Sequence, residues 1–145
     1  MNEAGTPDRV VAEALSWVGT PYRHQGARKG VGCDCIGLIT GVWCALYGAP
    51  PELPGPYAPD WAEATGEERL LDGMRRHFQE KPRQQMAAGN LLLFRWRSHL
   101  PAKHAGILTG PDRFVHAYEG TAVTESALVP QWRRRIAGVF AFPDI

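Results

Sequence analysis

The chain has 145 residues, enough for one domain with a single two-layered core and too few for two ordinary domains. Apolar residues make up 44% and charged residues 21%, a mixture that argues against an intrinsically disordered chain. Its 16 basic and 15 acidic side chains leave a net charge of +1, so no overall field favours nucleic acid as a partner. We therefore expect residues 1–145 to form one folded domain.

The N-terminus and the cysteine count predict where the protein is made. Residues 1–5 lack the basic and then apolar run of a secretory signal peptide. No apolar segment approaches the roughly 20 residues needed to cross a bilayer, so we expect no membrane insertion. Three cysteines are an odd number and favour free thiols, so we expect synthesis and folding in the reducing bacterial cytoplasm.

The first predicted helix begins at Thr6, which is the expected N-cap, with Pro7 at the first helical position and Asp8 in the first turn. Gly19 follows where a left-handed residue would end the helix near residue 18. Apolar side chains recur at helical spacing and form one face towards the core: Val10, Val11, Ala14, Leu15 and Val18. A glycine-rich loop without apolar periodicity is then expected over residues 20–34.

A buried central helix is predicted over residues 35–47, because almost every side chain there is apolar. Asp34 is the expected N-cap of this helix and Gly48 its expected end. Gly37 and Gly41 lie inside the segment, where each glycine costs about 1 kcal/mol relative to alanine. Their presence predicts that another segment closely approaches the helix backbone.

The rest of the chain changes from helical to β-type patterns. A proline-rich surface connection is expected over residues 49–59, followed by a helix from about Glu67 to Gln79. The predicted inward side chains of that helix are Leu70, Leu71, Met74 and Phe78. After Gly89 come five runs of strand-forming residues: 91–96, 104–108, 114–118, 122–125 and 136–142. Helices followed by strands favour an α+β fold with an antiparallel sheet.

Cys35 is the first candidate for chemistry, because it falls at the N-terminus of the predicted central helix. The helix dipole and the unpaired N–H groups there favour the thiolate, which is the reactive form of cysteine. The same N–H groups are candidate donors to the oxyanion of an acyl intermediate. Cys44 is interpreted as a small buried apolar side chain, whereas Cys33 fits either an inert loop thiol or a neighbour that tunes the site.

Two histidines fall on a predicted hairpin around the turn at residues 109–112, with His104 in the first strand and His116 in the second. If Ile107 pairs with Arg113, His104 lies directly across from His116 on one face of the sheet. A nucleophile, a base and a group that holds the base in its productive tautomer would then meet. A shift of one residue in the register would separate the two rings.

Other polar residues have plainer interpretations. His77 and His99 are expected to be solvated, whereas His24 stays unassigned in the glycine-rich loop. The run Arg133–Arg135 is expected on a solvated edge, with an anionic partner as the alternative. A zinc site built from the two cysteines of Cys-Asp-Cys and the two hairpin histidines is disfavoured, because this cysteine spacing is tighter than the usual zinc spacing.

Four short segments stand out together: Gly19–Tyr22, Gly32–Leu38, His104–Ile107 and Val115–Ala117. In order and spacing they resemble the motifs of the NlpC/P60 cell-wall peptidases. The likeness extends from about residue 8 to the C-terminus and is greatest to the phage-tail branch, which includes the peptidases of gene transfer agents. Any one of these motifs would be a weak signal, whereas four in order are specific.

The resemblance implies a papain-like fold in which Cys35 heads the central helix and attacks a peptide carbonyl. It implies His104 as base and acid, His116 as the group that orients it, and Tyr22 and Asp34 at the substrate or oxyanion site. The family typically cuts the bond from γ-D-glutamate to diaminopimelate in peptidoglycan, and no metal or organic cofactor is implied. A phage-like tail would carry the protein to the cell wall, with tail-tip or baseplate proteins as partners.

Two positions depart from the family pattern. Ile36 follows the nucleophile where serine is common, and Asn90 stands where Gly-Asp is usual before the first long strand. Because the serine hydroxyl is absent, the resemblance predicts the class of reaction more directly than it predicts which bond is cut. The alternatives are amidase, transpeptidase or acyltransferase chemistry through the same acyl-enzyme, or a structural tail module without activity.

Overall fold

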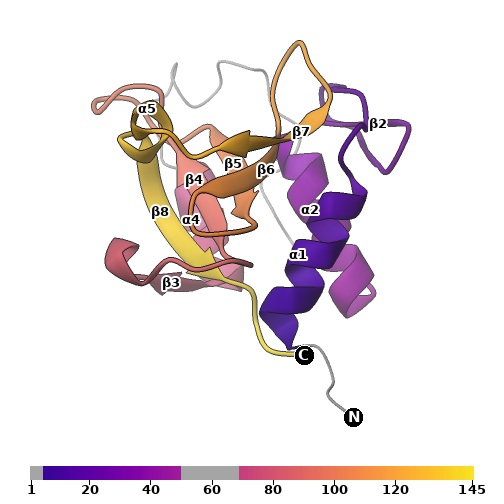
Figure 1. Cartoon of the computed structure of the whole chain (residues 1–145), viewed down its shortest axis with the longest axis horizontal. Coiled ribbons are helices and arrows are strands. Elements are labelled where there is room, and N and C mark those ends of the chain that lie inside the picture. The colour runs from indigo at the N-terminus through magenta and orange to yellow at the C-terminus, as the bar shows by residue number, and fades with distance from the viewer. Residues whose placement is uncertain (1–4, 50–68) are drawn as a thin grey trace.

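The computed structural model describes residues 5–49 and 69–145, in which helices pack against a six-stranded antiparallel sheet (Figure 1). The strand order is β3-β8-β4-β5-β6-β7, and every neighbouring pair is antiparallel. The predicted α+β fold is therefore confirmed. None of the described helices is both long and apolar enough to cross a bilayer. The predicted proline-rich connection lies, apart from Ala49, outside the described residues.

The helical elements are α1 (Thr6–Ser16), α2 (Cys35–Tyr47), α4 (Arg69–His77), the 3-10 turn η1 (Arg83–Gln85) and α5 (Pro130–Arg133). The strands of the main sheet are β3 (Gln79–Lys81), β4 (Leu91–Phe94), β5 (His104–Leu108), β6 (Arg113–Ala117), β7 (Val123–Ala127) and β8 (Ile136–Ala141). A separate two-stranded ribbon joins β1 (Ala27–Arg28) to β2 (Gly32–Cys33).

The predicted central helix is confirmed as α2, with the predicted residues and the predicted cap. Asp34 Oδ1 accepts a hydrogen bond from the Gly37 amide at 2.8 Å. A side chain at Gly37 would clash with the backbone carbonyl of Gly26, and one at Gly41 would clash with the Trp17 indole. The predicted close approach to both glycines is thus confirmed, and it is made by the segment that leads into β1 and by the end of α1.

The first helix differs from its prediction at its start and on its buried face. Its N-cap residue is Gly5 rather than Thr6. Leu15 and Val18 were predicted to face the core, but both are exposed. The buried face instead follows positions 10, 14 and 17, a spacing of i, i+4 and i+7 that brings Trp17 into the core in their place.

Residues 20–34 are more ordered than the predicted loop, because they hold the ribbon of β1 and β2 and pair with their surroundings. Tyr22 forms an isolated bridge with Cys33, and Pro21 forms one with Ala122. The Cys33 amide also donates to the Pro21 carbonyl at 3.0 Å. These contacts fix the segment that leads to Cys35.

The hairpin of β5 and β6 has a register two residues away from the predicted one. Ile107 pairs with Val115, and His116 lies opposite Gly106. Because side chains alternate between the two faces of a strand, a shift of two residues keeps His104 and His116 on one face as diagonal neighbours. The predicted opposite position was wrong, and the predicted shared face is confirmed.

The sheet is covered on both faces, so every residue of β4 and β5 is buried. One apolar cluster lies between the sheet and the helices and includes the four side chains predicted to face inward: Leu70, Leu71, Met74 and Phe78. The helix itself ends at His77, earlier than predicted, because Gln79 already begins β3. A second cluster on the other face gathers Phe94 and Phe114 under Trp132 of α5. The histidine rings contact this second cluster, so their surroundings are apolar.

Candidate active site

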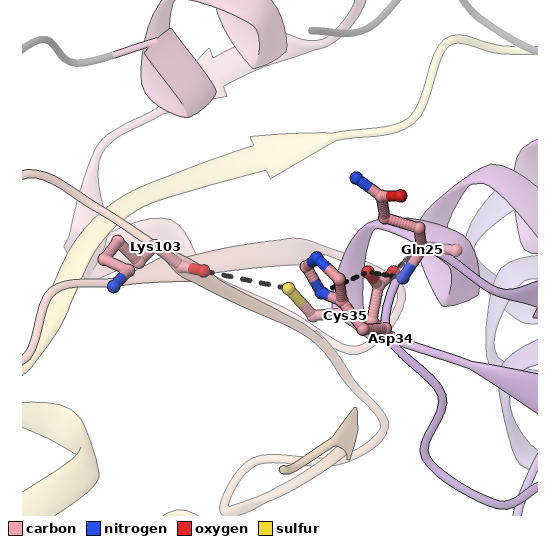
Figure 2. A network of polar contacts seen from close by, with 6 residues as sticks. Gln25, Asp34, Cys35 and Lys103 are labelled. Carbon is pink, nitrogen blue, oxygen red and sulfur yellow. Dashed lines mark hydrogen bonds and ion pairs between the residues drawn. The ribbon is translucent and has the colours of Figure 1, made fainter. Parts of the chain in front are cut away.

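Cys35 is the first residue of α2, and its thiol lies against the chain at the start of β5. Sγ donates a hydrogen bond to the Lys103 backbone carbonyl at 3.8 Å (Figure 2). Because Lys103 immediately precedes His104, the backbone that carries the predicted base touches the predicted nucleophile. Among the described residues neither histidine ring accepts a hydrogen bond from the thiol; in substrate-free enzymes such contacts often form only when substrate binds.

Asp34 fixes the chain on both sides of the nucleophile. Its side chain is 1% exposed, with Oδ1 bonded to the Gly37 amide and Oδ2 accepting from the Gln25 amide at 2.7 Å (Figure 2). His24 Nδ1 lies 4.0 Å from the same Oδ2. Gln25 has a φ of 62°, an uncommon value for a residue other than glycine, and its bond to Asp34 offsets that strain. The structure thus places the predicted substrate residue Asp34 where its carboxylate joins the loop to the helix start.

The two histidine rings form a hydrogen-bonded chain that continues to a serine. His104 Nε2 lies 2.9 Å from His116 Nδ1, and His116 Nε2 lies 2.9 Å from Ser126 Oγ. Ser126 is a member of the site that the sequence prediction missed. Strand alternation could have indicated it. Thr124 of β7 pairs with His116, and Ser126, two residues further on, therefore lies on the same face of the sheet as His116.

Four aromatic side chains surround the His104 ring: Phe94, Trp96, Tyr118 and Trp132. Burial, and secondarily the neighbouring His116, lower the pKa of His104 to about 3. Burial also lowers the pKa of His116 to about 4. Both rings are therefore neutral at pH 7, which is the form in which an imidazole accepts a proton.

The Cys35 thiol and the Tyr22 hydroxyl are both held in their protonated forms, so the predicted preference of Cys35 for the thiolate is wrong. Burial, and then the charge of Asp34, raise the pKa of Cys35 to about 12, against opposing hydrogen bonds from backbone amides that include those of Ile36 and Ala105. Burial, followed by the charges of Cys35 and Asp34, raises the pKa of Tyr22 to about 12. The thiol therefore needs a base to remove its proton, and the hydroxyl retains a proton to donate.

The remaining cysteines and histidines have structural surroundings. Cys33 is fully buried, and burial raises the pKa of its thiol to about 12, which favours the inert-thiol interpretation. Cys44 is only half-buried, less than predicted. His77 is half-buried beside Trp43 and not simply solvated as predicted. Within residues 5–49 and 69–145, no three His, Cys, Asp or Glu side chains are grouped so that they could hold a metal ion.

The free energy of unfolding is expected to decrease as the pH falls from about 6.5 towards 4. Both histidines have folded-state pKa values below their ordinary 6.5, so the unfolded chain binds more protons in this range. Each can contribute a slope of up to about 1.4 kcal/mol per pH unit. Urea denaturation at pH 7, 6 and 5 measures the slope, and the double variant His104→Gln/His116→Gln should flatten it. An equal slope in that variant would show that other groups cause the dependence.

Comparison with known proteins identifies the family. The profile of the NlpC/P60 family matches residues 19–140. The Gamma-DL-glutamyl hydrolase of Bacillus subtilis (strain 168) is 29% identical over 137 residues, which cover 94% of this chain and 29% of that protein. The Murein DD-endopeptidase MepS/Murein LD-carboxypeptidase of Escherichia coli (strain K12) is 29% identical over 128 residues, 88% of this chain and 58% of that protein. The chain therefore spans less than two thirds of either curated relative.

A solved structure extends the likeness to the fold. RipD from Mycobacterium tuberculosis, described as a non-catalytic NlpC/p60 domain protein with an adaptation to peptidoglycan-binding function, matches with a TM-score of 0.64 at 18% identity. The match covers 96% of this chain and 98% of that one. The predicted NlpC/P60 fold is thus confirmed over nearly the whole length of both chains.

Proposed function

Because the chain belongs to the NlpC/P60 family, we propose that it is a cysteine peptidase that hydrolyses the peptide stems of peptidoglycan. One observation carries the proposal. The Cys35 thiol lies at the N-terminus of α2 and bonds to the residue before His104, whose ring forms a 2.9 Å contact with His116. The thiol of the proposed nucleophile thus contacts the chain next to the proposed base, which is bonded to its proposed orienting group, and this supports the proposal.

One consistent set of proton positions makes His104 the base. Its Nε2 contacts His116, so its Nδ1 is left to take the thiol proton. His104 Nε2–H then donates to His116 Nδ1, and His116 Nε2–H donates to Ser126 Oγ. Both rings start neutral, as their lowered pKa values require, and His104 becomes an imidazolium when it accepts the proton.

The reaction proceeds through a thioester. The sulfur of Cys35 bonds to the carbonyl carbon, and the carbonyl electron pair moves to the oxygen, where the α2 backbone amides and the Tyr22 hydroxyl are the nearby donors. Collapse of this intermediate breaks the C–N bond, and the departing amine takes the proton from His104. Water then attacks the thioester, its proton passes to His104, and the acid product leaves as the thiol regains its proton.

We infer that the cut bond joins γ-D-glutamate to diaminopimelate. The Bacillus relative, named as a gamma-DL-glutamyl hydrolase, supports the γ-glutamyl side of this assignment. The Escherichia coli relative is named for a DD-endopeptidase and an LD-carboxypeptidase, so the family resemblance alone leaves the bond open. Ile36 packs partly buried against the core on the helix side and supplies no hydroxyl to the substrate, so contacts elsewhere must select the bond.

We also propose that a phage-like tail carries the protein to the cell wall after its synthesis in the cytoplasm. The support is the resemblance of the sequence motifs to the phage-tail branch, and tail-tip or baseplate proteins would be its partners. Mass spectrometry of purified tail-like particles tests this location. The chain should copurify with the other tail proteins, and particles that contain those proteins without it would contradict the proposal.

Digestion of diaminopimelate-type murein tests the activity. Purified protein should release soluble fragments split between D-glutamate and diaminopimelate, identified by mass spectrometry, and Cys35→Ala should release none. Fragments split at another bond would support the peptidase activity but contradict the proposed bond. If the wild type releases nothing but binds murein in a sedimentation assay, a non-catalytic wall-binding module becomes the better account.

Exchange of Ser126 for alanine is expected to lower kcat by about tenfold and leave KM nearly unchanged, because His116 loses the hydroxyl that fixes its tautomer. Ser126→Thr retains a hydroxyl and should recover most of the rate. The measurement is steady-state cleavage of a stem peptide by all three proteins. An alanine variant with wild-type kcat would remove Ser126 from the chain of orienting groups.

A further inference from the structure

We infer that a groove lined by arginines beside His104 binds a carboxylate of the substrate, an inference that rests on the proposed peptidase function. Two hollows of about 420 Å³ and 540 Å³ share Trp96, Arg97 and Arg135 as lining residues, and we treat them together as one groove. Arg134 also lines the first hollow, and Tyr118 also lines the second. These five residues define the arginine groove.

The arginine groove carries positive charge that the described protein does not neutralise. Within residues 5–49 and 69–145, no Asp or Glu forms an ion pair with Arg97, Arg134 or Arg135. Arg97 and Arg134 are exposed, whereas the Arg135 guanidinium lies 5.6 Å from the Trp96 ring centre and 5.7 Å from that of Trp132. Such stacking orders a guanidinium and leaves its N–H groups available to a bidentate acceptor such as a carboxylate.

The groove adjoins the base of the proposed reaction. Trp96 stacks on the His104 ring with 5.4 Å between ring centres and 24° between planes. Tyr118 meets the same ring edge-on at 5.9 Å. Two residues that line the groove therefore contact the His104 ring directly, so the groove lies beside the base of the proposed reaction.

Arg133, which precedes Arg134 in the chain, has a guanidinium that is used in structural hydrogen bonds. Arg133 Nε donates to the Leu128 carbonyl and its Nη2 to the Pro111 carbonyl, both at 3.1 Å. Its side chain thus ties α5 to the turns around it. Arg134 and Arg135 have no such contact among the described residues, which favours an anionic partner over a solvated edge for these two.

The substrate class offers a carboxylate on either side of the proposed cut. A γ-glutamyl linkage leaves the α-carboxylate of the glutamyl residue free, and diaminopimelate retains a carboxylate at the far end of its side chain. Either group matches a guanidinium pair in charge and in planar geometry. We therefore assign the groove to the binding of a substrate carboxylate. Amidation of one carboxylate at a time identifies which of the two it binds.

The test uses the stem peptide L-Ala-γ-D-Glu-diaminopimelate and two versions, each with one of these carboxylates converted to an amide. Wild type should cut the free acid with a kcat/KM about tenfold above that for one of the amides. In the double variant Arg97→Gln/Arg134→Gln, kcat/KM should fall about tenfold for the free acid and little for that amide. Arg9→Gln, an exposed arginine on α1, is the matched control and should retain the wild-type preference.

Titration calorimetry with the Cys35→Ala protein gives a readout of binding without cleavage. Affinity for the free acid should fall on amidation of the preferred carboxylate and in the arginine double variant built on Cys35→Ala. If wild type cuts all three peptides equally well and the double variant behaves as wild type, the groove assignment is wrong while the peptidase stands. If wild type cuts none of them but the calorimetry shows the arginine-dependent preference, the peptidase proposal fails and the carboxylate site stands.

Discussion

Exchange of His104 for alanine is expected to lower kcat by a factor of about 10²–10⁴, the usual range for the loss of a general base. The reason is the protonation state of the thiol, since burial and Asp34 raise the pKa of Cys35 and leave little thiolate at pH 7. The proton must therefore leave as the sulfur attacks. Stopped assays on a stem peptide, with circular dichroism to verify folding, measure the loss.

The His116 variants provide the control for that prediction. His116→Ala should cost less than His104→Ala, because His116 acts through its 2.9 Å contact with His104 and not on the thiol. The double variant should be no slower than His104→Ala alone, since groups that act as a unit are not additive. A His104→Ala protein that cuts at the wild-type rate would remove His104 from the mechanism.

Exchange of Asp34 for alanine is expected to lower the free energy of unfolding by about 2–4 kcal/mol. Loss of the N-cap bond to Gly37 accounts for about 1 kcal/mol, and the Gln25 amide left without its acceptor accounts for about 1–3 kcal/mol. Urea denaturation at pH 7 measures the change. Activity should fall as well, because the same carboxylate holds the chain on both sides of Cys35.

Asp34→Asn separates the two contributions, because an amide side chain retains one acceptor oxygen for Gly37 and offers a donor where Gln25 needs an acceptor. Its stability should lie between wild type and Asp34→Ala. Asp112→Ala, an exposed acid in the turn between β5 and β6, should change the stability by no more than about 0.5 kcal/mol. If Asp34→Ala is as stable as the Asp112 control, the carboxylate does not hold this part of the fold.

The central helix could be predicted from sequence because its signals are local. The cap at Asp34, the apolar run and the left-handed end at Gly48 all lie within the segment they define, and α2 has the predicted bounds. The positions of Gly37 and Gly41 also predicted close packing without naming the partner. Placement of Cys35 at a helix N-terminus follows from these signals alone.

The register of β5 and β6 could not be predicted because it depends on a contact from elsewhere in the chain. The Leu128 amide donates to the Asp112 carbonyl at 2.7 Å and so ties the turn to the end of β7. Thr109 closes the turn by donating its amide to the Arg113 carbonyl at 2.9 Å, which centres the turn on residue 111, one residue later than the predicted pairing requires. Alternation still fixed the shared face of the histidines, since a shift of two residues preserves it.

The partners of the site were harder to predict because tertiary packing assembles them. Ser126, which contacts His116, lies on β7, ten residues further along the chain. The arginine groove joins the segment after β4 to the segment between α5 and β8, which meet only because β4 and β8 are neighbours in the sheet. No spacing rule in the sequence connects Arg97 with Arg134.

The most direct test of the central claim compares the three cysteines in the cleavage of one defined bond. The stem peptide is incubated with wild type, Cys35→Ala, Cys33→Ala and Cys44→Ala, and the new amine is quantified by mass spectrometry. Cys35→Ala should show no cleavage above background, whereas the two controls should retain most of the wild-type rate. Equal cleavage by Cys35→Ala, or a loss that follows Cys33 instead, would contradict the assignment of Cys35 as the nucleophile.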